Sequence, residues 1–102
     1  ASETVAAIER LGCRALALRA PAEDFDAGER LVARTLETLG AIGILVHNAG
    51  VDWDGTPVAE TRPEDLLRVM TINALAPHHL SRLVLPRMRA LGRGDIVMVS
   101  SM

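Results

Sequence analysis

Small polar residues follow two apolar segments of this sequence, at Asn48-Ala49-Gly50 and at Ser100-Ser101. An asparagine amide beside small residues can fix a bulky ligand that approaches the backbone, and a serine hydroxyl can donate a hydrogen bond to a substrate oxygen. Each group also has a structural explanation, because Asn and Gly are common in turns and serines commonly cap helices. The position of residues 48–50 after an apolar segment favours a ligand-contacting turn, whereas the two serines taken alone favour a structural role.

Asn73 is a polar residue on the apolar stripe of a long helical pattern. Pro77 lies four residues later and has no N–H, so it cannot donate the hydrogen bond that an α-helix would give to the Asn73 carbonyl. The sequence therefore predicts a bend in the helix and a free carbonyl at Asn73. A buried free carbonyl commonly binds an ordered water, which makes Asn73 a candidate water-holding residue. The alternative is that Asn73 satisfies its side chain on a nearby loop backbone.

Helical and strand patterns alternate along the chain, with short connections between them. Helices are predicted over 2–11, from Asp24 or Asp26 to about Leu39, and from a capping box at Thr61-Arg62-Pro63-Glu64 to about Leu91. Strands are predicted over 13–19, 44–47 and 95–100. Continuous apolar strands in this order predict an α/β fold with a three-layer, doubly wound parallel sheet. Ligands bind such sheets beyond the carboxyl ends of the strands, where residues 48–50 and 100–101 lie.

Composition narrows the possible partners. The chain has 102 residues, enough for one domain or a piece of one, and its net charge of -2 gives no electrostatic reason to expect nucleic acid or an anionic membrane. No apolar segment approaches the roughly 18 residues of a membrane span, no signal peptide is visible, and the single Cys13 suits a reducing compartment, so a cytoplasmic location is expected. His47, His78 and His79 offer no ligand pair on one helical face, so no metal site is predicted. The chain contains no Tyr and no Lys, which limits its acid–base chemistry.

Taken together, these residues resemble the classical short-chain dehydrogenase/reductase family, with a collinear match from Ala1 to Ser101. His47-Asn48-Ala49-Gly50 is similar to the Asn-Asn-Ala-Gly segment that follows the fourth strand of the family, with His47 in place of the first asparagine. The segment 61–89 is similar to the long interface helix with its catalytic asparagine, and 95–101 to the fifth strand, whose second serine is catalytic.

The resemblance implies NAD(P)-dependent hydride transfer between nicotinamide and a small alcohol or carbonyl substrate, with NAD or NADP as cofactor. It implies catalytic roles for Asn73 and Ser101, cofactor contacts from Asn48, Ala49 and Gly50, and homo-oligomer formation through helix 62–91.

Two parts of the family pattern are absent from this sequence: the glycine-rich turn would precede Ala1, and the Tyr-x-x-x-Lys pair would follow Met102. Residues 1–102 are therefore expected to be a partial Rossmann-like domain, covering strands 3 to 5 of the family and inactive alone. In the family order 3-2-1-4-5-6-7, strand 3 would lack its neighbour, so the polypeptide alone is expected to be unstable or to pair this strand non-natively. Two alternatives are a non-catalytic binding or scaffolding subunit of this fold, and an unrelated flavodoxin-like regulator, which would have acidic strand ends.

Overall fold

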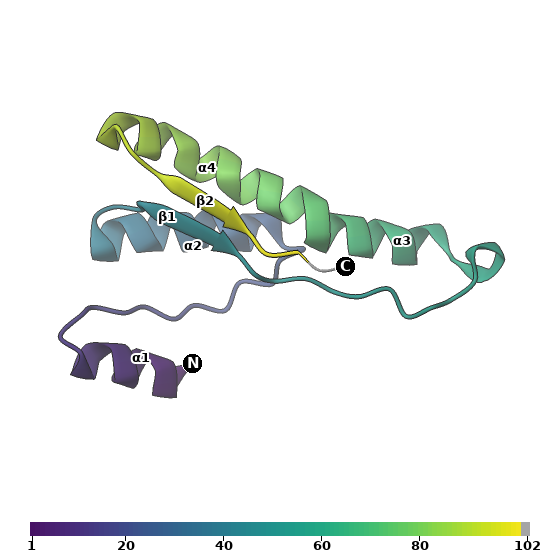
Figure 1. Cartoon of the computed structure of the whole chain (residues 1–102), viewed down its shortest axis with the longest axis horizontal. Coiled ribbons are helices and arrows are strands. Elements are labelled where there is room, and N and C mark those ends of the chain that lie inside the picture. Colours follow the sequence, from purple (N-terminus) through teal and green to yellow (C-terminus); the bar gives the residue numbers. More distant parts are fainter. Residues whose placement is uncertain (101–102) are drawn as a thin grey trace.

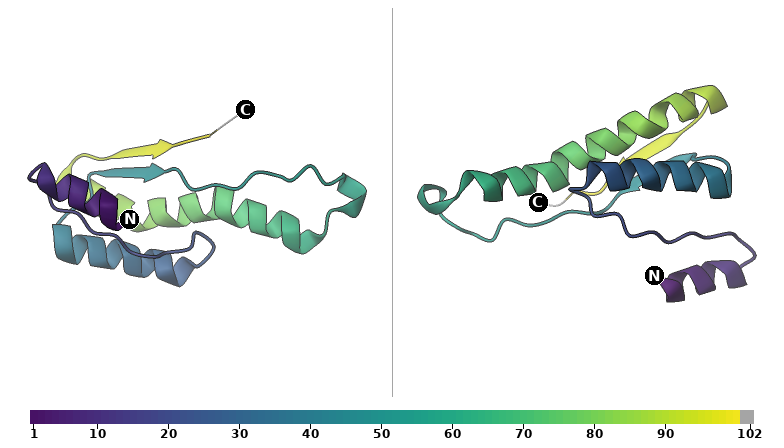
Figure 2. Two further views of the ribbon diagram at one scale, coloured as in Figure 1. Left: turned by 90° about the horizontal axis from the view of Figure 1, so that it is seen from below. Right: turned by 180° about the vertical axis from the view of Figure 1, so that it is seen from behind.

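The computed structural model describes residues 1–100 and contains a two-stranded parallel sheet with helices against one of its faces (Figure 1). In chain order the elements are α1 (Ser2–Arg10), α2 (Phe25–Leu39), β1 (Ile44–His47), the 3-10 turn η1 (Val58–Glu60), α3 (Pro63–Met70), the π-helical turn η2 (Thr71–Leu75), α4 (Ala76–Leu91) and β2 (Asp95–Met98). Figure 2 shows α2 and α4 on the same side of the sheet. The parallel pairing confirms the predicted α/β class, whereas the predicted third layer is not present among residues 1–100.

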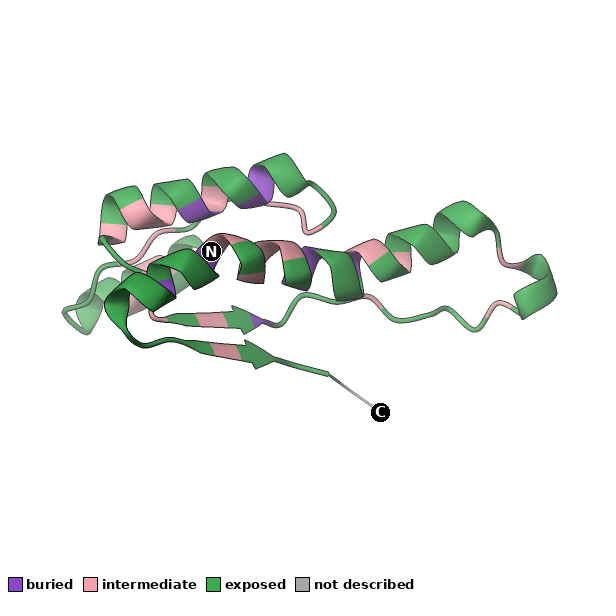
Figure 3. Cartoon of the chain, turned by 90° about the horizontal axis from the view of Figure 1, so that it is seen from above, coloured by how far each residue is buried: buried purple, intermediate pink, exposed green. Residues whose placement is uncertain are grey.

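The two strands pair in register from Ile44 opposite Asp95 to His47 opposite Met98. Side chains alternate between the faces of a strand, so Leu45 and Ile96 point to the same face. Both pack against the small core of Val32, Val84 and Met88, which α2 and α4 supply. The other face is bare in this structure, with Ile44 and Val46 exposed by 65% and 55% (Figure 3).

Residues 13–19 do not form a strand, so this prediction is wrong. A strand needs a neighbour that accepts and donates its backbone hydrogen bonds, and no described segment pairs with this one. Figure 1 shows the segment running as an extended connection apart from β1. It is attached to α2 instead, because the Arg14 guanidinium donates hydrogen bonds to the carbonyls of Thr38 and Leu39 at 3.1 and 3.3 Å. These are among the last carbonyls of α2, which have no partner inside the helix.

The predicted start of α2 is confirmed in detail. Asp24 is its N-cap, and the Asp24 carboxylate accepts a hydrogen bond from the Ala27 N–H at 3.0 Å. Gly40 follows the last residue with a positive φ of 90° and ends the helix. The second predicted strand, 44–47, matches β1, whereas β2 is shorter than the predicted 95–100.

The long predicted helix 62–91 is present as three consecutive sections, α3, η2 and α4. Its predicted capping box is wrong: Arg62 is the N-cap, and the Thr61 hydroxyl donates instead to the Pro57 carbonyl at 3.0 Å. Pro63 occupies the first helical position, where its missing N–H leaves no bond unmade.

The predicted apolar stripe of this helix is buried along only part of its length. Val84 and Met88 are buried against the sheet and α2, whereas Leu66 and Met70 are exposed because neither the sheet nor α2 covers α3 (Figure 3). Among residues 1–100, no helix combines the length and apolar character needed to cross a bilayer.

Candidate functional site

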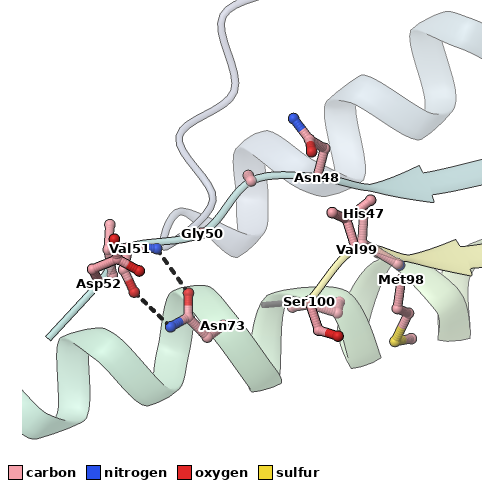
Figure 4. A pocket seen from close by; sticks show the side chains of 11 residues that line it. His47, Asn48, Gly50, Val51, Asp52, Asn73, Met98, Val99 and Ser100 are labelled. Carbon is pink, nitrogen blue, oxygen red and sulfur yellow. Dashed lines mark hydrogen bonds between the residues drawn. The ribbon is translucent and has the colours of Figure 1, made fainter. Parts of the chain in front are cut away.

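A cleft of about 550 Å³ lies beyond the carboxyl ends of β1 and β2 (Figure 4). Its lining residues are His47, Asn48, Ala49, Gly50, Val51, Asp52, Asn73, Pro77, Met98, Val99 and Ser100. The structure thus brings together Asn48, Ala49, Gly50 and Asn73, which the sequence singled out separately. Ser101, the other predicted site residue, lies outside the described residues.

The Asn73 side chain is attached to the chain that leaves β1. Its Oδ1 accepts a hydrogen bond from the Val51 N–H at 2.9 Å, and its Nδ2 donates to the Val51 carbonyl at 2.8 Å. Both polar ends of the amide are therefore satisfied by one residue, as Figure 4 shows. Asn73 itself is exposed, so its predicted burial is wrong. Its side chain is hydrogen bonded to a loop backbone, which was the alternative interpretation of the sequence.

Gly50 leaves space for this contact. A Cβ at Gly50 would lie 3.3 Å from the Asn73 Oδ1, which is closer than an ordinary van der Waals contact. Gly50 is not among the described glycines with positive φ, so the need is for space rather than for an unusual backbone conformation. The small residue allows a close approach, and what approaches it here is Asn73.

The backbone at Asn73 departs from α-helical geometry, at the place where Pro77 predicts a bend. The departure takes the form of η2, in which the Ala76 N–H donates to the Thr71 carbonyl five residues earlier. Single π-helical turns of this kind are frequent at functional sites. Pro77 is buried and lines the cleft, and it has no N–H to offer the Asn73 carbonyl.

His47 is a residue that the sequence reasoning did not place in the cleft. It ends the apolar strand β1 with only 8% of its surface exposed, and its Nε2 is hydrogen bonded to the Ser81 Oγ of α4 at 3.2 Å. Burial lowers the pKa of the imidazole below its usual value, which favours the neutral ring. The sequence contained one signal for this placement. Asn73, Pro77 and Ser81 are spaced four residues apart, so they lie on one face of the helix.

Asp52 is the one carboxylate among the lining residues, and it is exposed. Residues 1–100 contain no cluster of three or more His, Cys, Asp and Glu side chains arranged to hold a metal ion. The cleft therefore offers hydrogen-bonding groups and accessible backbone as its means of recognition.

Comparisons with known proteins identify the family of this chain. The family model for short chain dehydrogenases matches residues 1–102. An uncharacterised oxidoreductase of Thermotoga maritima is 41% identical over 73 residues, which cover 72% of this chain and 29% of that protein.

Solved structures are similar over almost the whole chain. A metagenomic short-chain oxidoreductase in complex with NADP superimposes with a TM-score of 0.89 at 30% identity, covering 99% of this chain and 46% of that one. A 7α-hydroxysteroid dehydrogenase complexed with NADH and 7-oxo glycochenodeoxycholic acid gives 0.88 at 32% identity, covering 99% and 39%. The chain spans less than half the length of each of these proteins. It belongs to the short-chain dehydrogenase family.

Proposed function

We propose that this chain is the central part of an NAD(P)-dependent oxidoreductase that transfers a hydride between nicotinamide and a small alcohol or carbonyl substrate. The observation that carries the proposal is the cleft at the carboxyl ends of β1 and β2, which gathers Asn48, Ala49, Gly50 and Asn73. Ligands of open α/β sheets bind at this edge. Structural neighbours described with NADP and NADH support a nicotinamide cofactor.

The residues of the cleft fit such a cofactor. Its volume of about 550 Å³ is in the usual range of small-molecule sites. Ala49 and Gly50 leave the backbone accessible, and Asn48 adds an amide beside them. These three residues would hold the cofactor, which supplies a hydride donor or acceptor when bound.

The remaining roles are those that the family resemblance implies. The Asn73 carbonyl, deprived of the Pro77 N–H, holds a water for proton transfer, and the Ser101 hydroxyl orients the substrate oxygen. The chain contains no Tyr and no Lys, so an acid–base pair of the family type must come from outside residues 1–102. We therefore propose that this chain corresponds to strands 3 to 5 of a partial Rossmann-like domain and is inactive alone.

Two further properties belong to the complete protein. The exposed Leu66, Leu67 and Met70 on α3 suit a homo-oligomer formed through helix 62–91. A cytoplasmic location agrees with the single Cys13.

The test is cofactor binding and turnover by the complete protein. NADH and NADPH titrations followed by nicotinamide fluorescence should show saturable binding, and one of the two should support reduction of a carbonyl substrate. Asn73→Ala keeps the backbone carbonyl but removes both side-chain hydrogen bonds to Val51. The resulting displacement of the cleft should lower kcat by about ten- to a hundredfold, the loss that a misplacement of about 1 Å can cause. Arg93→Ala, which lies outside the cleft, is the control and should match the wild type. Binding without turnover on any alcohol or carbonyl would indicate the non-catalytic alternative, and absence of binding would refute the proposal.

A further inference from the structure

We propose that His47 is a positioning residue, whose hydrogen bond to Ser81 holds the cofactor-contacting residues 48–50 straight across the cleft. The expected effect on cofactor affinity rests on the proposed function. The hydrogen bonds from which the inference is argued do not depend on that function. It concerns the 47–51 segment, which leaves β1 and passes along the long helix (Figure 4).

The 47–51 segment is attached to the helix at both ends. At one end His47 Nε2 is hydrogen bonded to the Ser81 Oγ at 3.2 Å, and at the other Val51 makes two hydrogen bonds to the Asn73 side chain. Ser81 and Asn73 are eight residues apart, so they lie on one face of the helix, with Pro77 between them. Residues 48–50 have no hydrogen bond of their own among the described ones. They depend on these two side-chain attachments and on the backbone pairing of His47 with the second strand.

The helix between Asn73 and Ser81 and the segment from His47 to Val51 are similar in length. Eight residues of helix span about 12 Å at 1.5 Å per residue. Four steps of extended chain, from His47 to Val51, span at most about 13 to 14 Å. The segment therefore has little slack, and loss of either side-chain attachment would loosen residues 48–50 beside Pro77, while the backbone of His47 stays paired with β2.

His47 is suited to this role because it also joins the two strands. Its carbonyl accepts a hydrogen bond from the Val99 N–H at 2.9 Å, so the same residue contacts β1, β2 and α4. The family segment that this one resembles has asparagine at this position, whose amide ends one bond nearer the backbone than the histidine Nε2. Glutamine places its amide about as far from the backbone as Nε2. His47→Asn and His47→Gln therefore test whether the length of the side chain decides the contact with Ser81.

The first measurement needs no cofactor. Amide hydrogen exchange at Val51, whose N–H donates to Asn73, reports how often the segment opens. In the complete protein, His47→Leu and Ser81→Ala should each speed this exchange by about three- to tenfold, the range expected for one net hydrogen bond. His47→Gln should exchange like the wild type, and His47→Asn like His47→Leu.

The second measurement is the NADH and NADPH dissociation constant of the same variants. It should rise by the same three- to tenfold in His47→Leu, Ser81→Ala and their double variant, because all three lose one shared hydrogen bond. Val84→Ala is the control for general loosening, since it removes buried core volume away from the cleft. It should lower the melting temperature while leaving the dissociation constant unchanged.

The outcomes separate this inference from the proposed function. Wild-type protein that binds neither cofactor refutes the proposed function, and the exchange at Val51 then still decides whether His47 holds the segment. Unchanged exchange in His47→Leu overturns the inference, as does an equal loss of cofactor affinity in Val84→Ala.

Discussion

At the scale of single residues, His47 stands out as the buried polar side chain among the described residues. A buried imidazole is favoured in its neutral form, because taking a charge out of water is costly. Its hydrogen bond to Ser81 satisfies the ring at Nε2 without requiring that charge. In the sequence, His47 stands in place of the first asparagine of the family segment and forms no metal-ligand pair. Its hydrogen bond could not be predicted there, since Ser81 lies 34 residues away.

This burial predicts a pH dependence of stability. Burial lowers the pKa of His47 in the folded protein below its usual value of 6.5, so unfolding takes up a proton between the folded pKa and about 6.5. Stability should therefore fall as the pH drops through about 6.5 toward the folded pKa. His47→Gln keeps an uncharged hydrogen-bonding group and should lose less stability over that range. Urea denaturation of both proteins at about pH 7.5 and about pH 5 measures the difference.

Parallel loss of stability in the two proteins would contradict this prediction. A larger loss in His47→Gln would mean that the folded protein prefers the protonated ring, opposite to the direction that burial gives.

At the scale of elements, the sequence predicts the helices better than the strands. The Asp24 cap, the end at Gly40 and the irregularity before Pro77 depend on residues within a few positions of one another, so a local pattern contains them. Residues 13–19 show the limit, because a strand exists only where a second segment pairs with it. Thr61 shows a second limit. Its hydroxyl could cap the following helix or bond to the preceding loop, and in the structure it donates to the Pro57 carbonyl.

The same distinction applies to the site. Asn48–Gly50 and Asn73 are recognisable from residue type and spacing, but the two hydrogen bonds that join Asn73 to Val51 connect elements 22 residues apart. Gly50 also looks like a turn glycine in the sequence, whereas the structure assigns it a steric role beside the Asn73 Oδ1.

The turn between α4 and β2 gives a prediction about packing. A Cβ on Gly94 would lie 2.7 Å from the Met88 Cβ and closer still to its Cγ and Sδ, and Met88 is buried in the core. Gly94→Ala should therefore destabilise the protein by about 1 to 3 kcal/mol, the usual range for overpacking. Gly43→Ala is a matched control, because Gly43 precedes β1 as Gly94 precedes β2, and a Cβ there meets nothing within 4 Å.

Urea denaturation of the complete protein measures both changes, and Gly43→Ala should stay within about 0.5 kcal/mol of the wild type. Equal stability of the two variants would show that Met88 can move aside without cost, which its burial between α2 and α4 argues against.

At the scale of the whole molecule, the chain is less compact than a typical folded domain of its length. Its radius of gyration is 16.0 Å, against about 13 Å for a compact domain of about 100 residues. Its accessible surface is 7709 Å², whereas a compact protein of 10.9 kDa would expose about 5,600 Å². The excess includes the bare face of the sheet, with Ile44 and Val46, and the apolar side of α3, with Leu66 and Met70.

These bare surfaces predict how the 102-residue chain behaves by itself. Folded domains are only marginally stable, and this chain has a core of few buried residues to offset the entropy of ordering its backbone. We expect the chain alone to bind an apolar dye such as ANS and to melt over a broad range, while the complete protein melts in one sharp transition. Calorimetry and dye fluorescence of both proteins measure this, with sedimentation to separate monomer from aggregate. A sharp transition of the monomeric chain at about 45–65 °C, without dye binding, would show that its small core suffices and that the bare faces need no cover.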